Sequence, residues 1–188
     1  MSALKISALA AFVGSILFLI AAFMPISRVY MLSAPDKLAL ITAQREAWGF
    51  SQALFSAGSI VFAAGVGLAA FALRDQPAAP FLFVATAFLA AGAVVWSWHV
   101  YLRVIDPTAF AQGSLPGWQF ASYTVLTMAA FLLIGIALLQ MGFPAWAGWL
   151  LVGGSLLLFV LYVIFGDMPP FAHYLLGLAF AFALFRRG

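Results

Sequence analysis

The chain has 188 residues, of which 66% are apolar and only 7% are charged, and its formal net charge is +3. Soluble domains are about 45–50% apolar and about 25% charged, so the few charged groups here cannot coat a water-soluble fold. The basic residues are scattered rather than clustered, which argues against nucleic-acid binding. The sequence contains no cysteine, which excludes disulfides, thiolate metal sites and covalently attached haem. The composition therefore predicts an integral membrane protein with the lipid bilayer as its main partner.

Six long apolar stretches predict six transmembrane helices in a single membrane domain, residues 1–188. A helix needs about 20 residues to cross the roughly 30 Å hydrocarbon core. The stretches lack the alternation of membrane β-strands, so helices are expected. The predicted spans cover residues 6–24, 50–73, 80–102, 118–141, 145–165 and 169–186. The predicted fold is thus an all-α polytopic bundle of six transmembrane helices.

The longest connection, residues 25–49, predicts a short amphipathic helix between the first two spans. Its first turn contains a proline and an acidic residue, as helix starts often do. Three- and four-residue spacing then places several side chains on one helix face: Leu38, Ile41, Arg45 and Trp48. We expect this helix to lie at the membrane interface or to run on into the second span. Residues 108–117, between the third and fourth spans, contain turn signals and predict a loop.

No catalytic motif is present, which favours a protein that is not an enzyme. The residues that could carry chemistry gather on the side of the bundle opposite the termini. His99 and Arg103 are one helical turn apart near the end of the third span, and His173 lies in the first turns of the sixth. Both histidines share helix faces with small residues, so we expect both imidazoles to point into the bundle.

Two interpretations of the histidines stay open. Neutral imidazoles could ligate a b-type haem or a transition metal between the third and sixth spans. They could equally be hydrogen-bonding residues near helix ends, which is the commoner role. A metal without haem would need further ligands from Asp106, Asp167 or Glu46.

Arg45 stands where the amphipathic pattern expects an apolar residue. A guanidinium there could bind an anion or a lipid headgroup, or it could reach the interface and pair with Asp106 or Asp167. Glu46, the only glutamate, is expected to be an exposed interfacial partner.

Four tryptophans near one interface are typical of an aromatic belt: Trp48, Trp96, Trp98 and Trp118. Trp96 could instead wall a ligand pocket beside His99.

The sequence predicts a non-catalytic bundle that binds a small or amphiphilic ligand in an outward-facing polar pocket, or that serves as a subunit of a membrane complex or homo-oligomer. The candidate ligand-binding residues are His99, His173, Arg45, Arg103, Asp106, Asp167, Glu46 and Trp96. The alternatives are a redox protein that holds haem or quinone through the two histidines, and a small-solute transporter. Nearly charge-free span centres without central prolines argue against transport. Lys and Arg divide four to four between the two sides of the predicted bundle. Those on the side of the termini lie at span ends in very short loops, which favours cytoplasmic termini in the inner membrane.

Overall fold

The computed structural model describes residues 2–187, and every regular element in that range is a helix. The long helices are α1 (Ala3–Phe23), α3 (Arg45–Ala72), α4 (Ala79–Ile105), α6 (Gly117–Gln140), α7 (Ala145–Phe165) and α8 (Phe171–Arg187). The short helices are η1 (Pro25–Met31), α2 (Ala34–Ala43) and α5 (Pro107–Gln112). The predicted all-α fold class and the short helix between the first two spans are therefore confirmed.

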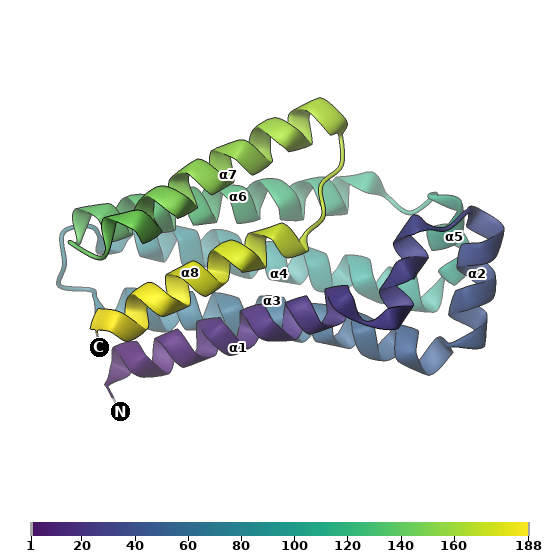
Figure 1. The fold of residues 1–188 in the computed structure, drawn as a ribbon, viewed down its shortest axis with the longest axis horizontal. Coiled ribbons are helices and arrows are strands. Elements are labelled where there is room, and N and C mark those ends of the chain that lie inside the picture. Colours follow the sequence, from purple (N-terminus) through teal and green to yellow (C-terminus); the bar gives the residue numbers. More distant parts are fainter. Residues whose placement is uncertain (1, 188) are drawn as a thin grey trace.

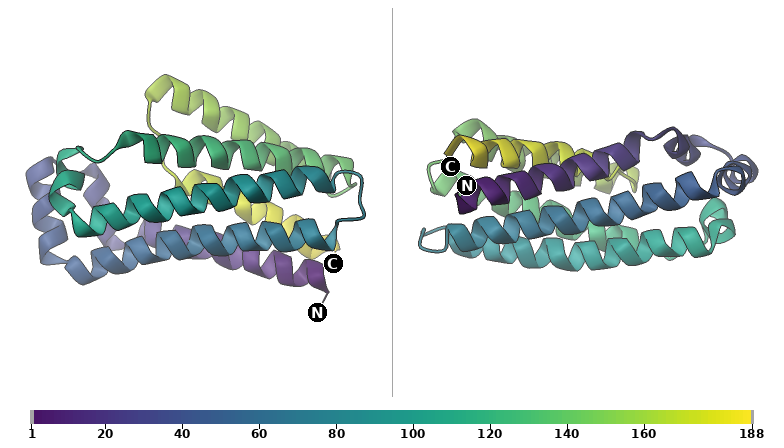
Figure 2. Two further views of the ribbon diagram at one scale, coloured as in Figure 1. Left: turned by 180° about the vertical axis from the view of Figure 1, so that it is seen from behind. Right: turned by 90° about the horizontal axis from the view of Figure 1, so that it is seen from below.

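The long helices form two layers that close into a ring. Figures 1 and 2 show α1, α7 and α8 in one layer and α3, α4 and α6 in the other. Contacts run from α1 to α3, α4, α6, α7, α8 and back to α1. The start of α1 and the end of α8 lie at the same end of the bundle, while α2 and α5 lie at the opposite end (Figure 1). The three short helices η1, α2 and α5 are named the cap below.

Five helices, α1, α3, α4, α6 and α7, are long and apolar enough to cross a membrane. Their outer faces expose large apolar side chains, such as Val163 and Phe165 of α7 at 65% and 71%, as a lipid-facing surface requires. α8 has 17 residues and rises about 26 Å, less than the roughly 30 Å hydrocarbon core. The chain is thus a membrane-embedded helical bundle, and the sixth crossing stays a prediction.

Close packing between α1 and α3 depends on glycine. A Cβ atom added at Gly58 would lie 2.7 Å from the backbone nitrogen of Phe18 and 2.8 Å from the carbonyl oxygen of Gly14. Across the same contact, the Ser7 hydroxyl donates a 2.7 Å hydrogen bond to the carbonyl of Gly65. Two helix backbones approach this closely only where side chains are small or absent.

The second span begins earlier than predicted, because the chain breaks between α2 and α3. At Gln44 the backbone leaves the helical region, with φ −126° and ψ 44°. The predicted amphipathic helix therefore does not run on into the second span, and α3 begins at Arg45 rather than at residue 50. α4 continues to Ile105, beyond the predicted end, so Arg103 lies inside that helix.

Two other connections also differ from the prediction. The predicted loop between the third and fourth spans contains α5, whose start is capped by Asp106: its Oδ1 accepts a 2.8 Å hydrogen bond from the Ala109 N–H. α8 begins at Phe171, so Pro169 and Pro170 precede it rather than forming its first turn. A proline disfavours helical backbone in the residue before it, and Pro170 acts on Pro169 in this way.

Gly58→Ala is expected to lower the free energy of unfolding, because the new methyl group must push α1 away from α3. Overpacking of this kind costs about 1–3 kcal/mol. Gly153→Ala in α7 is the matched control, since no atom of another helix lies within 4 Å of the Cβ that it would add. Thermal unfolding in detergent, followed by circular dichroism, measures both variants. Equal midpoints would contradict the close α1–α3 contact.

Candidate ligand-binding site

A small second core holds the cap against the ends of α3 and α4. Its buried members are Ile26, Val29, Leu40, Ile41 and Trp48. The indole N–H of Trp48 donates a 3.2 Å hydrogen bond to the backbone carbonyl of Arg103, and its ring stacks on Phe110 with 5.2 Å between centroids. Trp48 is only 1% exposed, so its predicted place in a lipid-facing belt is wrong.

A cavity of about 430 Å³ lies beneath the cap. It forms where α8 starts short of the cap end, so that the link between α7 and α8 crosses this region in place of a helix (Figure 1). Most of its wall is apolar or aromatic, and the aromatic members are Tyr30, Phe55, Trp96, Phe120 and Phe171. Its two charged members are Arg103 and Asp167. Met31, another lining residue, is 92% exposed and marks the mouth.

Arg103 is a buried cation in the wall of this cavity, with 7% of its surface exposed. Its Nη1 donates a 3.1 Å hydrogen bond to the hydroxyl oxygen of Tyr30, and its Nη2 donates a 3.0 Å hydrogen bond to Nε2 of His99. Its Nε is buried without a hydrogen-bond partner. In the part of the chain that the structure describes, ion pairing is limited to Arg74 and Asp75. No carboxylate in that part of the chain therefore forms an ion pair with the buried guanidinium.

A hydrogen-bond network orients Arg103 and determines the tautomer of His99. Arginine can only donate, so Nε2 of His99 accepts and the imidazole is neutral. The proton on Nδ1 then donates to Oε1 of Gln119, 3.0 Å away. Gln52 adds a 3.4 Å hydrogen bond from its Nε2 to the Tyr30 hydroxyl oxygen. The network joins η1, α3, α4 and α6.

Three aromatic rings surround the guanidinium. Its Cζ lies 5.0 Å from the ring centroid of Trp96, 5.2 Å from that of Phe110 and 5.6 Å from that of Tyr30. Aromatic faces attract cations, and the attraction grows when water is excluded. The rings offset part of the desolvation cost of Arg103, but they supply no net negative charge.

Three of the predicted site residues line the cavity: Trp96, Arg103 and Asp167. Trp96 is 1% exposed, so it is a cavity wall and not part of a lipid-facing belt. Asp167 is exposed, and its Oδ1 accepts a 2.7 Å hydrogen bond from the Met168 N–H. His99 lies behind Arg103 and positions its side chain.

Three other predicted residues are exposed at the cap end and do not line the cavity: Arg45, Glu46 and Asp106. The predicted helix face shared by Arg45 and Leu38 does not exist, because the break at Gln44 separates their helices. Nor does Arg45 form an ion pair with an aspartate within the described residues.

His173 lies deep in the bundle, fully buried as predicted. Its Nδ1 donates a 3.1 Å hydrogen bond to the carbonyl of Pro170, and its Nε2 has no partner. The rings of Phe131 and Tyr123 flank it, with centroids 6.3 and 6.4 Å away.

This geometry does not favour a haem held by His99 and His173. Both ring nitrogens of His99 are engaged in hydrogen bonds, so iron would have to displace Arg103 or Gln119. Within residues 2–187, His, Asp and Glu side chains form no group of three that could hold a metal ion.

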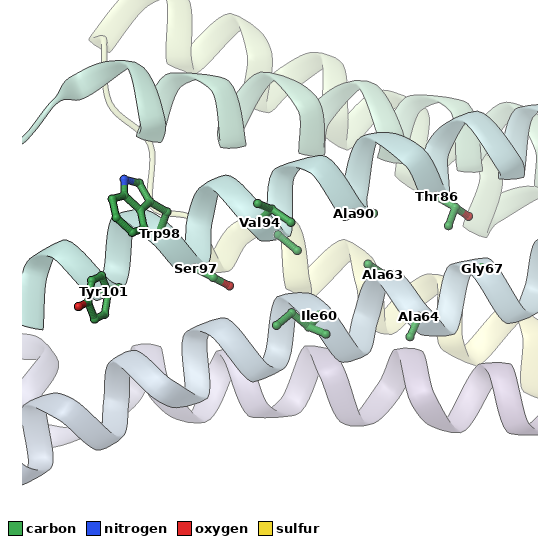
Figure 3. Close-up of a pocket in the computed structure, with 11 residues that line it drawn as sticks. Ile60, Ala63, Ala64, Gly67, Thr86, Ala90, Val94, Ser97, Trp98 and Tyr101 are labelled. Carbon is green, nitrogen blue, oxygen red and sulfur yellow. The ribbon is translucent and has the colours of Figure 1, made fainter.

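A second hollow, of about 830 Å³, lies between α3 and α4 (Figure 3). Small residues on the two facing helices make room for it: Ala63, Ala64, Gly67, Ala90 and Ala93. Its edges are open, since Ile60 is 52% and Val94 71% exposed. None of its eleven lining residues is charged, so it offers a lipid chain a mostly apolar surface without a charged group to select a head group.

Three residues of the Arg103 network are absent from the sequence predictions: Tyr30, Gln52 and Gln119. Tyr30 is 73 positions from Arg103, and no spacing rule connects them. Gln119 left no signal in the sequence, because a polar side chain in the first turn of a helix is common, and only the structure shows that it is 2% exposed.

The chain matches no protein-family model, no curated protein and no solved structure. Its function is therefore inferred from the cavity and its charges.

Tyr30→Phe is expected to destabilise the protein by about 1.5–3 kcal/mol, the usual contribution of a hydrogen bond to a charged group. Tyr101→Phe is the matched control, since Tyr101 belongs to the same end of α4 but is 51% exposed. Thermal unfolding in detergent measures the stability of Tyr30→Phe and of Tyr101→Phe. The network would be wrong if the two variants unfolded at the same temperature.

Haem added to the purified protein is expected to give no histidine-dependent Soret band, because both ring nitrogens of His99 are hydrogen-bonded and His173 is fully buried beside Tyr123 and Phe131. Absorption titrations compare the wild type with His99→Ala, His173→Ala and haem in detergent alone. A Soret band that either substitution abolishes would contradict this expectation.

Proposed function

We propose that this chain is a non-catalytic membrane protein that binds a small or amphiphilic ligand in the cavity beneath the cap. The observation that carries the proposal is the buried Arg103, which lines this cavity and has no ion-pair partner among the described residues. A charge in an apolar interior is expensive, and in membrane proteins such groups commonly mark binding sites or pathways.

The size and lining of the cavity support the same proposal. Ligand sites typically occupy about 300–1,000 Å³ and combine apolar or aromatic walls with a few placed polar groups. The cavity, at about 430 Å³, falls in this range and places Arg103 among aromatic rings. His99 is engaged on both nitrogens, which leaves it no free site for proton transfer. Binding without catalysis is therefore the simplest function.

The proposal includes an orientation in which the cavity mouth faces away from the cytoplasm. The end of the bundle that contains the termini has basic residues beside short connections or at chain ends: Lys5, Arg74, Arg186 and Arg187. Basic residues in such positions favour the cytoplasmic side of a bacterial-type inner membrane. The cap, at the opposite end, would then meet the outer leaflet and the exterior.

Because the sequence has no cysteine, a single introduced thiol can report on the cavity. Ala22→Cys places a thiol in the cavity wall, and Ala21→Cys places one at a fully buried position outside it. We expect the uncharged reagent methyl methanethiosulfonate to modify Ala22→Cys faster, and a bound single-chain amphiphile to slow that reaction. Mass spectrometry follows both rates in a neutral maltoside detergent.

The amphiphiles used are decanoate, decanol and decyltrimethylammonium, each at the same mole fraction of the micelle. Protection of Ala22→Cys by any of them, with the Ala21→Cys rate unchanged, supports a ligand cavity. Equal rates for the two variants, or no protection by any amphiphile, would overturn the proposal.

A further inference from the structure

We infer that the ligand carries an anionic head group, a carboxylate or a phosphate, which binds the guanidinium of Arg103 while its apolar part fills the aromatic cavity. This inference rests on the proposed function and specifies the chemical class of its ligand.

The hydrogen-bonding groups around Arg103 select an acceptor. The Nε–H of Arg103 is buried and unpartnered. The hydroxyl oxygen of Tyr30 accepts from Arg103 and from Gln52, which leaves its own proton free to donate. Nε2 of His99 is already occupied by Arg103. A ligand group that fits must present lone pairs, as a carboxylate, a phosphate or a carbonyl does.

Charge then selects an anion over a neutral carbonyl. Arg103 as a residue is only 7% exposed, and the described residues place no carboxylate within ion-pair distance of it. A buried cation gains most from an opposite charge that also hydrogen-bonds to it. A neutral carbonyl would satisfy the hydrogen bond and leave the charge unbalanced.

Asp167 does not take the place of such an anion. It lines the same cavity, but it is exposed and its Oδ1 accepts from the Met168 N–H. An exposed carboxylate is hydrated and screened, so it needs no partner and weakly repels an incoming anion. Asp167 thus gives the site a second, opposing charge whose removal can be tested.

The remaining wall accommodates an apolar chain. Phe55, Trp96 and Phe120 line the cavity from three different helices, and Phe171 closes it from the start of α8. A ligand with a charged head at Arg103 would bury its chain against these rings. The expected ligand is therefore an anionic amphiphile, either a free fatty acid or an anionic lipid.

The thiol-protection assay on Ala22→Cys, at mildly alkaline pH where decanoate is ionised, tests this class. Decanoate, decanol and decyltrimethylammonium share one chain and differ in head-group charge. We expect decanoate to give half-protection at a mole fraction about tenfold below that of decanol, as one charge-assisted hydrogen bond allows. Decyltrimethylammonium is expected to protect least. Phosphatidylglycerol, added at the same mole fraction, compares a lipid head group with the free acid, and stronger protection by either one supports the anionic class.

The order in which the amphiphiles protect Ala22→Cys separates failure of this inference from failure of the proposed function. Equal protection by decanoate and decanol, or strongest protection by the cation, would overturn the inference and leave the proposed function standing. Absence of protection by every amphiphile would overturn both. The ranking measured in Ala22→Cys, with Arg103 intact, already decides the class, so the result does not depend on any variant of Arg103.

Two variants, each made in the Ala22→Cys background, locate the effect. Arg103→Gln is expected to raise the half-protecting mole fraction of decanoate to that of decanol. Asp167→Asn is expected to lower it about twofold, in line with the small energies of exposed charge interactions, without changing that of decanol. If Arg103→Gln does not fold, Asp167→Asn and the ranking in Ala22→Cys alone remain. A decanoate response unchanged in Asp167→Asn would overturn the assignment to this cavity.

Discussion

A buried guanidinium without an ion-pair partner among the described residues is the constraint on which the cap end of this bundle depends. Arg103 is accommodated because acceptors and aromatic faces from separate elements converge on it: η1 supplies Tyr30, α4 supplies His99 and Trp96, and α6 supplies Gln119 to orient His99. The positions of η1, α4 and α6 are therefore coupled. Loss of one member leaves another buried polar group unpaired, which costs more than one average hydrogen bond.

The cap end of the bundle has room for the cavity because α8, the last helix, is short. Two consecutive prolines, Pro169 and Pro170, delay the start of α8 to Phe171, and the irregular link that results lies over the region that further helical turns would fill. Irregular backbone near membrane depth is tolerated where it lines a cavity or is buried in protein. The cavity and the interrupted helix thus share one cause in the sequence, and the link contributes Asp167 to the rim.

Apolar length was sufficient to predict the long helices, because lipid leaves the backbone of such a segment few alternatives to an α-helix. It also placed His99 and Arg103 one turn apart near one end. The sequence pattern could not reveal Tyr30, because its hydrogen bond with Arg103 forms only when η1 packs against the end of α4. The burial of Trp48 was missed for a related reason: neither proline nor glycine marks the break at Gln44, and only that break turns the indole beneath the cap rather than towards lipid.

The level of Arg103 along α4 connects the chemistry of the cavity with the bilayer around it. Arg103 lies in the last turn of the helix, whereas Trp96 lies about two turns nearer the middle. The cost of a charge is greatest at the bilayer centre and falls towards the interface. The cavity therefore has the polarity of a membrane amphiphile, with its charge near the interface and its apolar wall towards the centre. Arginine suits this position better than lysine, because its rigid fork can donate to Tyr30, His99 and a ligand in three directions at once.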